Sequence, residues 1–432
     1  MLGVGRRGPV GRTDALPVAG GGWPPDRRRD MGEAERDAWV VLAGVHGIGP
    51  VTFARLLDAF GTATAVLEVA RGSRATADLI AASRGREGGS ETLGPDAARE
   101  LVVAARNVER QLAVTRAAGL AVITLADDAY PSRLRRIDLP PPVLFVRGDP
   151  AALDRDRAVA IVGTRRPTEQ GRSMAGRIAD AVAGLGATIV SGLALGIDAA
   201  AHAAAVRSGR PTVAVIGGGH GRLYPAAHRG LASGIASRGG AVISEFAPDV
   251  IPTRGTFPRR NRIISGLADA TVVVEAGARS GALTTAAWAL EQGRALHIVP
   301  GRPGDPTVAG CLAFLRETAP EARIVAGVAE LGEDLGLRDG PSARDSTSPA
   351  STPAGQLALD GLLATLGAAE RAIAREVVSG TGTVDELVTE TGWPAATVLG
   401  ALTALEIRGL VLEAFGRYRA AGPLAGARPR AA

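Results

Sequence analysis

Short apolar runs rich in β-branched residues recur through the middle of the chain, each followed by a glycine-rich break and an amphipathic stretch. The runs occupy 158–163, 188–192, 212–218, 241–245, 271–276 and 296–301. The stretches between them, such as GRSMAGRIADAVAGLG and SGALTTAAWALEQG, have helical spacing. Strands without a polar side are buried on both faces, which requires a parallel sheet covered by helices. The pattern therefore predicts an α/β fold with a Rossmann-like, doubly wound, mostly parallel sheet.

The two ends of the chain have helical patterns of a different kind. In residues 44–61 a Gly-Ile-Gly turn separates two apolar segments, which is typical either of a helix-hairpin-helix, whose amides bind phosphate, or of a plain turn between packed helices. Residues 365–419 predict a helix, a helix-turn-helix and a short hairpin, the order of a winged helix. Its second motif helix has no arginine before Arg408, so contact with protein and contact with DNA both remain open.

Composition sets the boundaries between these parts, because stretches rich in Pro, Gly and Ser without periodicity predict tails and linkers. Met31 begins a well-patterned helix and is an alternative start of translation, in which case the preceding residues are absent from the protein. We expect a disordered tail at 1–30, a helical helix-hairpin-helix (SAM-like) domain at 31–130, a Rossmann-like domain at 131–330, a linker at 331–359, a winged helix at 360–420 and a disordered tail at 421–432.

Composition also excludes several classes of protein. The chain has 432 residues and a single cysteine, Cys311, which excludes a disulfide scaffold and a Cys-based zinc cluster. It has no apolar run of about 18 residues and no secretory signal, so we expect a cytoplasmic protein without a membrane span. All 49 basic side chains are arginine. The absence of lysine excludes a Walker-type nucleotide loop and Schiff-base chemistry.

Small residues and arginines follow the predicted strands, at the sheet edge where ligands of doubly wound folds bind. Glycine there lets a ligand approach backbone amides, and the helix N-termini favour an anion. The segments in question are Gly163-Thr164-Arg165-Arg166, Ser191-Gly192, Gly217-Gly218 and Ser280-Gly281.

The same edge lacks the groups that other ligands and reactions need. A GxGxxG fingerprint is absent after the first strand, and no acid follows the second strand, which disfavours a dinucleotide cofactor. We find no catalytic triad order, no cluster of metal ligands and no adjacent carboxylate pair. The sequence therefore predicts no cofactor, no metal site and no catalytic residues, and so a binding protein and not an enzyme.

The densest positive charge lies at residues 254–262, RGTFPRRNR, directly before a predicted helix. It holds four arginines and no acid, and arginine forks suit phosphate, while the ring of Phe257 can stack on a base. The alternative is a solvated loop with Phe257 packed inward. Asp198 and His202 stand four residues apart on one predicted helix. They form either a structural hydrogen bond within the helix or a functional pair, and their role stays open.

Seven segments between residues 158 and 301 match one known family in its own order. They are VGTRRPTEQG, SGLALGIDAAAH, VAVIGGGHGRLYPAAH, ISEF, FPRRNRIISGLA, VVVEAGARSGALTTAAWALEQGR and IVPG. Together they resemble the DNA processing protein A (DprA/Smf) family, which also has a helical N-terminal domain and a C-terminal winged helix. The resemblance implies a homodimer that binds and protects incoming single-stranded DNA and loads the RecA recombinase during natural transformation and recombination.

The resemblance also assigns roles to individual positions. It implies that Arg165 contacts a phosphate, that the arginines after Phe257 add further contacts, and that two Ser-Gly pairs form backbone cradles. The full set of expected DNA-binding residues is Gly163, Thr164, Arg165, Arg166, Ser191, Gly192, Gly218, Phe257, Arg259, Arg260, Asn261, Arg262, Ser280 and Gly281. His220, His228 and Leu312 depart from the family pattern, where Asp, Asn and Asn are expected.

Two alternative functions use the same fold. LOG-type nucleotide phosphoribohydrolases share a Rossmann-like architecture, but their Pro-Gly-Gly-x-Gly-Thr-x-x-Glu motif is absent, the nearest text being Glu275-Ala-Gly-Ala-Arg-Ser-Gly. A nucleotide-sensing Rossmann-like protein is the other alternative. Release of a free base from nucleoside monophosphates, without binding of an oligonucleotide, distinguishes the enzyme from the DNA-binding protein.

Overall fold

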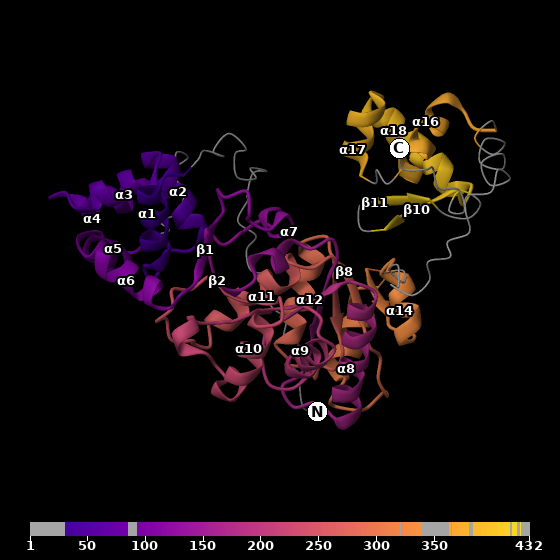
Figure 1. Ribbon diagram of the computed structural model, residues 1–432, viewed down its shortest axis with the longest axis horizontal. Helices are drawn as coiled ribbons and strands as arrows, with labels where there is room; N and C mark the ends of the chain where they lie inside the picture. Colours follow the sequence, from indigo (N-terminus) through magenta and orange to yellow (C-terminus); the bar gives the residue numbers. More distant parts are fainter. Residues whose placement is uncertain are drawn as a thin grey trace, which may run out of the picture. The chain divides into compact units, whose positions relative to one another are not determined.

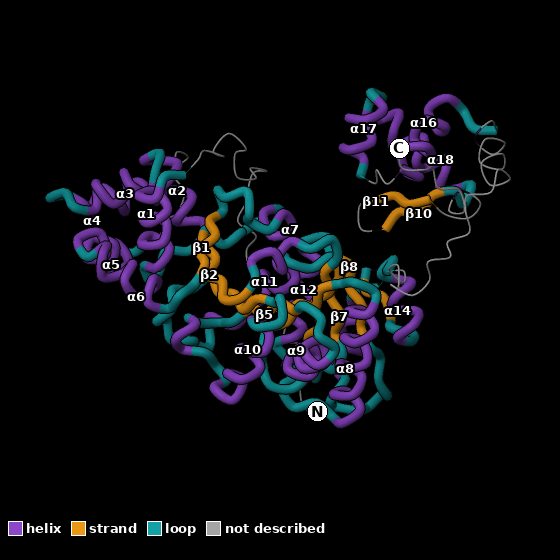
Figure 2. Tube along the Cα trace, in the orientation of Figure 1, coloured by secondary structure: helices purple, strands orange, loops and turns teal. Residues whose placement is uncertain are grey.

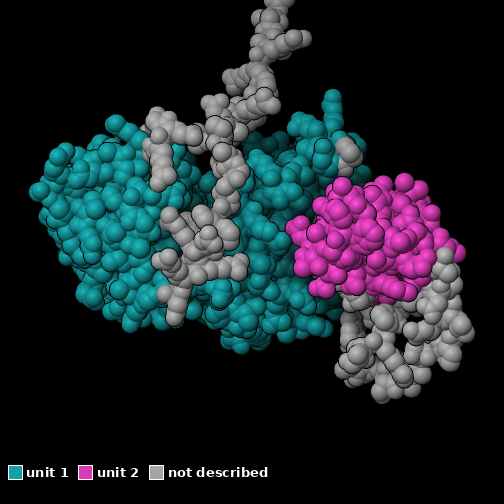
Figure 3. Space-filling view, turned by 90° about the horizontal axis from the view of Figure 1, so that it is seen from above, with its two compact units in different colours: residues 1–326 teal, residues 327–432 magenta. Residues whose placement is uncertain are grey.

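The computed structural model describes residues 31–84, 93–319, 321–337, 363, 365–379, 383–414, 417–420 and 424. The expected tails, apart from Leu424, and most of the expected linker lie outside these residues. The chain forms two compact units, Met1–Ala326 and Gly327–Ala432, which Figure 3 colours separately and which are described here one at a time.

A nine-stranded sheet runs through the first unit in the order β1-β2-β6-β5-β4-β3-β7-β8-β9. Seven neighbouring strands from β6 to β9 in that order are parallel, whereas β1 and β2 form an antiparallel edge. The strands are β1 (Ala121–Thr124), β2 (Val143–Gly148), β3 (Ala158–Val162), β4 (Thr188–Ser191), β5 (Thr212–Val215), β6 (Ala241–Ser244), β7 (Ala270–Val273), β8 (Ala295–Ile298) and β9 (Ala322–Ile324).

Helices cover both faces of this sheet, as Figure 2 shows. One face carries α8 (Glu169–Gly184), α9 (Ile197–Arg207) and α10 (Arg229–Ala236), and the other carries α11 (Thr256–Gly266) and α12 (Ala282–Glu291). Because β3 to β7 are buried along their whole length, both layers are needed. The predicted α/β fold class is confirmed.

The order of strands reverses beside β3, which places a topological switch at the centre of the sheet. From β3 the chain moves outward through β4, β5 and β6, then returns to add β7 on the other side of β3 and continues to β8 and β9. The loops after β3 and β7 therefore diverge and leave a crevice at the carboxyl ends of these strands.

The two edge strands, β1 and β9, and the strand β2 beside β1 were not among the predicted runs. β1 and β9 are short and partly exposed, and β2 ends in the exposed pair Arg147-Gly148. The sheet thus begins at Ala121, inside the range expected for the helical domain. Two further short elements of the first unit are α7 (Ser132–Arg135) and α13 (Ala309–Glu317).

Among the described residues, six helices precede the sheet (Figure 1). Their buried side chains belong to the same hydrophobic core as the sheet. Trp39 and Phe53 pack edge to face with ring centroids 4.8 Å apart, and both belong to the core cluster that continues into β2 and β6. Arg36 Nη1 donates to Asp127 Oδ2 at 2.8 Å, which ties the first helix to the end of β1. The helices are α1 (Glu33–Gly44), α2 (Pro50–Phe60), α3 (Ala63–Ala70), α4 (Ala75–Ser83), α5 (Pro95–Arg106) and α6 (Val108–Ala117).

The second unit contains three packed helices and a two-stranded hairpin. Their bounds are α16 (Ala368–Ser379), α17 (Val384–Thr391), α18 (Ala395–Ile407), β10 (Val411–Ala414) and β11 (Arg417–Ala420), preceded by α14 (Val328–Asp334). Thr383 and Glu386 form a capping box at the start of α17, and Gly392 ends that helix with φ 68°. This is the predicted winged helix.

Candidate nucleic-acid interface

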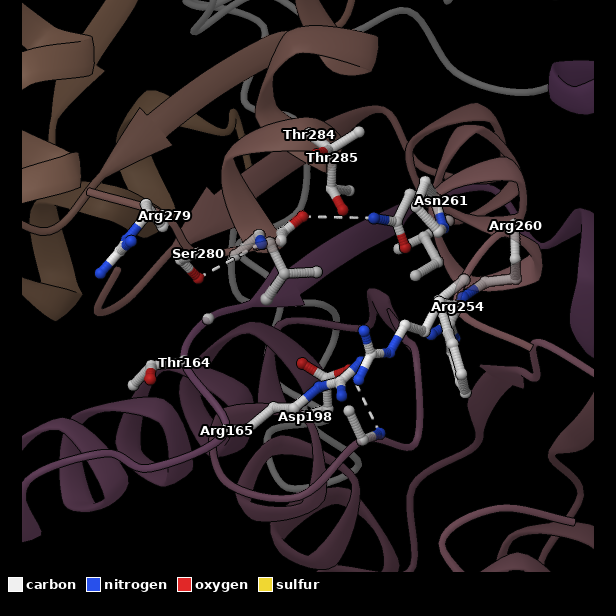
Figure 4. Close-up of a pocket in the computed structure, with 18 of the residues that line it drawn as sticks. Thr164, Arg165, Asp198, Arg254, Arg260, Asn261, Arg279, Ser280, Thr284 and Thr285 are labelled. Carbon is white, nitrogen blue, oxygen red and sulfur yellow. Dashed lines mark hydrogen bonds between the residues drawn. The ribbon is translucent and has the colours of Figure 1, made fainter. Parts of the chain in front are cut away.

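A cavity of about 840 Å³ opens at the topological switch of the sheet, where the loops after β3 and β7 diverge. The loop 163–166, the start of α11 and the loop 277–281 before α12 form its walls, and residues 252–254 add one side. Arg165 reaches into the cavity from one wall, and Arg279 and Ser280 lie on another (Figure 4). We call this cavity the switch pocket.

Four exposed arginines line the switch pocket: Arg165, Arg166, Arg254 and Arg279. The only acidic lining residue among the described part of the chain is Asp198, which is 5% exposed. The accessible charge of the pocket is therefore strongly positive. Arg254 and Arg279 were not among the expected contacts, although Arg254 begins the arginine-rich segment and Arg279 directly precedes Ser280.

Most of the arginine-rich segment is helical and does not precede the helix as expected. Helix α11 begins at Thr256, so successive side chains from Arg259 to Arg262 point in directions about 100° apart. Arg259 is exposed but lies outside the lining of the switch pocket, with its guanidinium 5.8 Å from the centroid of the Phe246 ring. A Cβ on Gly49 of the Gly-Ile-Gly turn would lie 3.6 Å from Arg259 Nη2, so Arg259 adjoins the helical hairpin.

Arg260 supports the floor of the pocket from inside the protein. It is 3% exposed, and its Nη1 donates to the carbonyls of Gly192, at 2.7 Å, and of Val215. Burial lowers the pKa of Arg260 to about 10, against the opposing effect of the Asp198 carboxylate. Arg260 therefore joins the ends of β4 and β5, and this burial contradicts its expected role as an open phosphate contact.

Arg262 is committed to a buried ion pair. Its guanidinium donates to both carboxylate oxygens of Glu245 at 2.9 and 2.7 Å and to the Leu139 carbonyl at 2.9 Å. Although burial opposes ionisation, the Glu245 carboxylate raises the pKa of Arg262. Arg262 is 4% exposed and does not line the pocket, so the expectation that it contacts phosphate is wrong.

The first of the two expected backbone cradles is closed. Ser191 is fully buried and its hydroxyl donates to the Ile161 carbonyl at 2.6 Å. The amide of Gly192 donates to Asp198 Oδ2 at 3.1 Å, and a Cβ at Gly192 would lie 2.5 Å from Arg260 Nη1. Glycine is needed at 192 to admit these two side chains and not a ligand. Gly218 likewise packs against Pro252 and does not line the pocket.

The second expected cradle opens onto the pocket. Ser280 and Gly281 line it at the start of α12, and a Cβ at Gly281 would meet no atom within 4 Å. Asn261 reaches across from α11 and donates from Nδ2 to the Gly281 carbonyl at 3.2 Å (Figure 4). Gly163 and Thr164, which directly follow β3, also line the pocket.

Two aromatic rings stand beside the arginines. Phe257 is half-buried, with the Arg165 guanidinium 5.3 Å from its ring centroid, and a Cβ at Gly217 would lie 2.8 Å from its ring. Tyr224 contacts Phe257 edge to face at 6.0 Å between centroids and is 55% exposed. The ring with a free surface is therefore Tyr224, which sequence reasoning overlooked because it lies in a loop distant in the chain.

Asp198 and His202 face different partners. Asp198 Oδ2 accepts from the amides of Gly192 and Ala194, whereas His202 Nδ1 lies 2.8 Å from Thr212 Oγ1. Burial raises the pKa of Asp198, although Arg260 and the two amides oppose that shift. Burial lowers the pKa of His202 to about 3. No hydrogen bond joins Asp198 to His202 in the described structure, so the alternative of a bond within the helix is wrong. Asp198 supports the loop after β4, and His202 lies against β5.

The three departures from the family pattern lie outside the pocket lining. His220 Nε2 lies 3.0 Å from the Val242 carbonyl, and His228 Nδ1 lies 2.8 Å from the Leu193 carbonyl. Leu312 packs against the hydrophobic core. None of these three side chains contacts the four exposed arginines of the switch pocket through a described hydrogen bond.

Neither a metal site nor a membrane-spanning helix is found among the described residues. No group of three or more His, Cys, Asp or Glu residues in the described part of the chain is arranged to hold a metal ion. None of the described helices is both long enough and apolar enough to cross a membrane.

Comparisons with known proteins match three parts of the chain to the domains of one family. Residues 121–335 match the family model described as DNA recombination-mediator protein A, residues 33–76 match the DprA-like N-terminal HHH domain, and residues 347–417 match the DprA winged helix domain. A putative DNA processing protein DprA of Mycobacterium tuberculosis is 39% identical over 351 residues, covering 78% of this chain and 85% of that protein. The chain belongs to the DprA/Smf family. The resemblance predicted from seven segments is thereby confirmed.

Other DprA/Smf proteins show how far the similarity extends. Protein Smf of Escherichia coli is 36% identical over 301 residues, covering 69% of this chain and 76% of that protein. The X-ray structure of DprA from Streptococcus pneumoniae has a TM-score of 0.54 and 28% identity, covering 70% of this chain and 97% of the other. The match of residues 33–76 identifies the Gly-Ile-Gly turn as part of a helix-hairpin-helix domain. The match of residues 347–417 identifies the second unit as a winged helix.

Proposed function

We propose that this DprA/Smf protein binds single-stranded DNA in the switch pocket, protects incoming strands and loads RecA recombinase onto them during natural transformation and recombination. It acts by binding and not by catalysis. The observation that carries the proposal is the convergence of four exposed arginines on one pocket at the topological switch.

The charge and size of the pocket support a polyanionic ligand. Arginine binds phosphate through paired donors, and the pocket presents such side chains from three separate loops. The loops after β3 and β7 add small residues through which a backbone phosphate can approach. We retain Gly163, Thr164, Arg165, Arg166, Phe257, Asn261, Ser280 and Gly281 as proposed contacts and add Arg254, Arg279 and Tyr224.

A salt series with labelled single- and double-stranded oligonucleotides tests this function. If about three or four phosphates are neutralised, the logarithm of the binding constant for the single strand should fall against log salt with a slope of about −2 to −3. The duplex should bind more weakly, because an unpaired base is needed beside Tyr224. Equal affinity for both, or no binding at low salt, would contradict the proposal.

Two variants locate the site. Arg165→Ala and Arg254→Ala should each weaken single-strand binding by about 1–3 kcal/mol, the value of a charge-assisted contact. Arg177→Ala, an exposed arginine on α8 outside the pocket, is the matched control and should leave binding unchanged. Unaltered binding by both pocket variants would exclude the switch pocket as the DNA site.

The same samples test the nucleotide-directed alternatives. Incubation with nucleoside monophosphates should release no free base, and a monophosphate should compete only weakly with the oligonucleotide because it supplies one phosphate. We further propose that the protein acts as a cytoplasmic homodimer; sedimentation measures the mass, and strand exchange by RecA on protein-coated DNA measures the loading step.

A further inference from the structure

Helix α18, the second helix of the helix-turn-helix, presents an apolar surface to solvent. Leu399 is 46% exposed and Ile407 is 82% exposed, and they lie on one side of the helix because they are eight residues apart. Trp393, in the turn that leads into α18, is 37% exposed. Gly400 and Thr403, also exposed, lie between these large side chains. We call this surface the α18 face.

The fold of the unit does not use the α18 face. Its core contains Val398, Ala401, Leu402 and Leu405, which are buried on the other side of the same helix. Helix α18 is therefore apolar on its buried side and again on its exposed side. An exposed apolar surface of this kind is typical of a site where another molecule binds.

The charges carried by α17, the turn and α18 oppose binding of DNA. Between Thr383 and Ile407 the chain carries four acids and no basic side chain: Asp385, Glu386, Glu390 and Glu406. Arg408, which follows, is paired with Glu370 at 3.4 Å between Nη1 and Oε2. A recognition helix that enters a DNA groove needs cations for the flanking phosphates, so a duplex would be repelled here.

We propose that the α18 face is a docking site for a basic, amphipathic segment of another protein. Apolar side chains of the partner cover Trp393, Leu399 and Ile407, and its arginines or lysines face the acids of α17. A second copy of the face fits less well, because it would bring acids against acids. This inference concerns the second unit alone and does not depend on DNA binding by the switch pocket.

A pair of designed peptides tests the proposal on the full-length protein. The first is a labelled helix of about five turns with leucines along one side and lysines beside them, and the second replaces every lysine with glutamate. Fluorescence anisotropy should show binding of the lysine peptide at least about tenfold tighter than of the glutamate peptide, a difference of about 1.4 kcal/mol.

Three sets of variants assign the binding to the α18 face. Leu399→Ser with Ile407→Ser, and separately Asp385→Asn with Glu390→Gln, should each weaken the lysine peptide about tenfold. Val103→Ser with Val114→Ser removes exposed apolar side chains from the first unit and should change nothing. Because the charge variant keeps every apolar contact, it remains informative if the serine variant unfolds.

Four results would overturn the proposal. The first is no binding of the lysine peptide, and the second is equal binding of both peptides. The third is loss of duplex DNA binding in the serine variant, which would make α18 a DNA-reading helix. The fourth is a serine variant that changes only the oligomeric state in sedimentation, which would assign the face to a second copy of the chain.

Discussion

At the scale of single residues, the arginines of this protein divide by burial into two groups with different tasks. Arg165, Arg166, Arg254 and Arg279 are exposed in the switch pocket, whereas Arg260 and Arg262 are buried and bonded to carbonyls or to Glu245. All six look alike in the sequence. The four exposed arginines lie in loops, whereas the two buried ones lie on α11, on sides of the helix that face the core.

The buried pair gives a prediction about stability. Arg262→Ala should lower the free energy of unfolding by about 3–5 kcal/mol, because it leaves the Glu245 carboxylate buried without its partner. Urea denaturation measures this loss. Substitution of the exposed Arg165 by Ala should change the free energy of unfolding little while it weakens DNA binding. Arg262→Ala should therefore be the less stable of the two variants. Comparable stability of both variants would contradict the role assigned to the pair.

Tyr224 gives a prediction about the bases. Tyr224→Ala should weaken single-strand binding by about 1–3 kcal/mol, the cost of losing one stacked base, whereas Tyr224→Phe keeps the ring and should bind normally. With an oligonucleotide that lacks bases, wild type and Tyr224→Ala should bind equally. A difference that persists on the abasic strand would show that the hydroxyl or the loop acts on the backbone.

At the scale of elements, helix α9 is fixed to the sheet by a buried neutral histidine. His202 is fully buried and lies against Thr212 of β5, and burial lowers its pKa to about 3. His220 is buried against Val242 of β6, and burial lowers its pKa to about 4. Both rings are therefore uncharged in the folded protein near neutral pH.

These histidines predict acid sensitivity. The unfolded chain binds protons below about pH 6.5 while the folded protein does not, so the free energy of unfolding should fall as pH falls from 6.5 to 5. Two such groups contribute a slope of up to about 2.7 kcal/mol per pH unit. His220→Gln should reduce that slope by about half, measured by urea unfolding at several pH values. An unchanged slope would mean that His220 does not stay neutral.

The elements also show what the sequence could and could not reveal. The six strands β3 to β8 were predicted because their residues are apolar on both faces. Strands β1 and β9 were missed since they are short and half-exposed at the edges, where alternation is weak. The start of α11 was placed too late, because its first turns are crowded with arginine and contain Pro258. Of the segments expected at the ligand edge, 163–166 and 280–281 line the switch pocket, whereas Ser191, Gly192 and Gly218 do not. Which arginines are exposed there depends on tertiary packing that the sequence pattern does not reveal.

At the scale of the whole first unit, the helical part and the sheet share one hydrophobic core, and we expect them to unfold together. Leu42 of α1 and Phe145 of β2 are fully buried members of the same core cluster. Leu42→Ala should cost about 2–5 kcal/mol and should increase hydrogen exchange at the amides of β2 and β6 as well as in α1. Increased exchange confined to the helices would show that the two parts unfold separately.

The position of Arg260 has a consequence for reading genetic data. A selection for loss of the proposed DNA binding would recover substitutions at Arg260 together with those at Arg165 and Arg254, and all three would appear as one functional cluster. Because the Arg260 guanidinium holds the ends of β4 and β5, its loss would reduce the amount of intact protein in the cell. Protein abundance, measured beside phenotype, would separate this residue from its neighbours in the pocket.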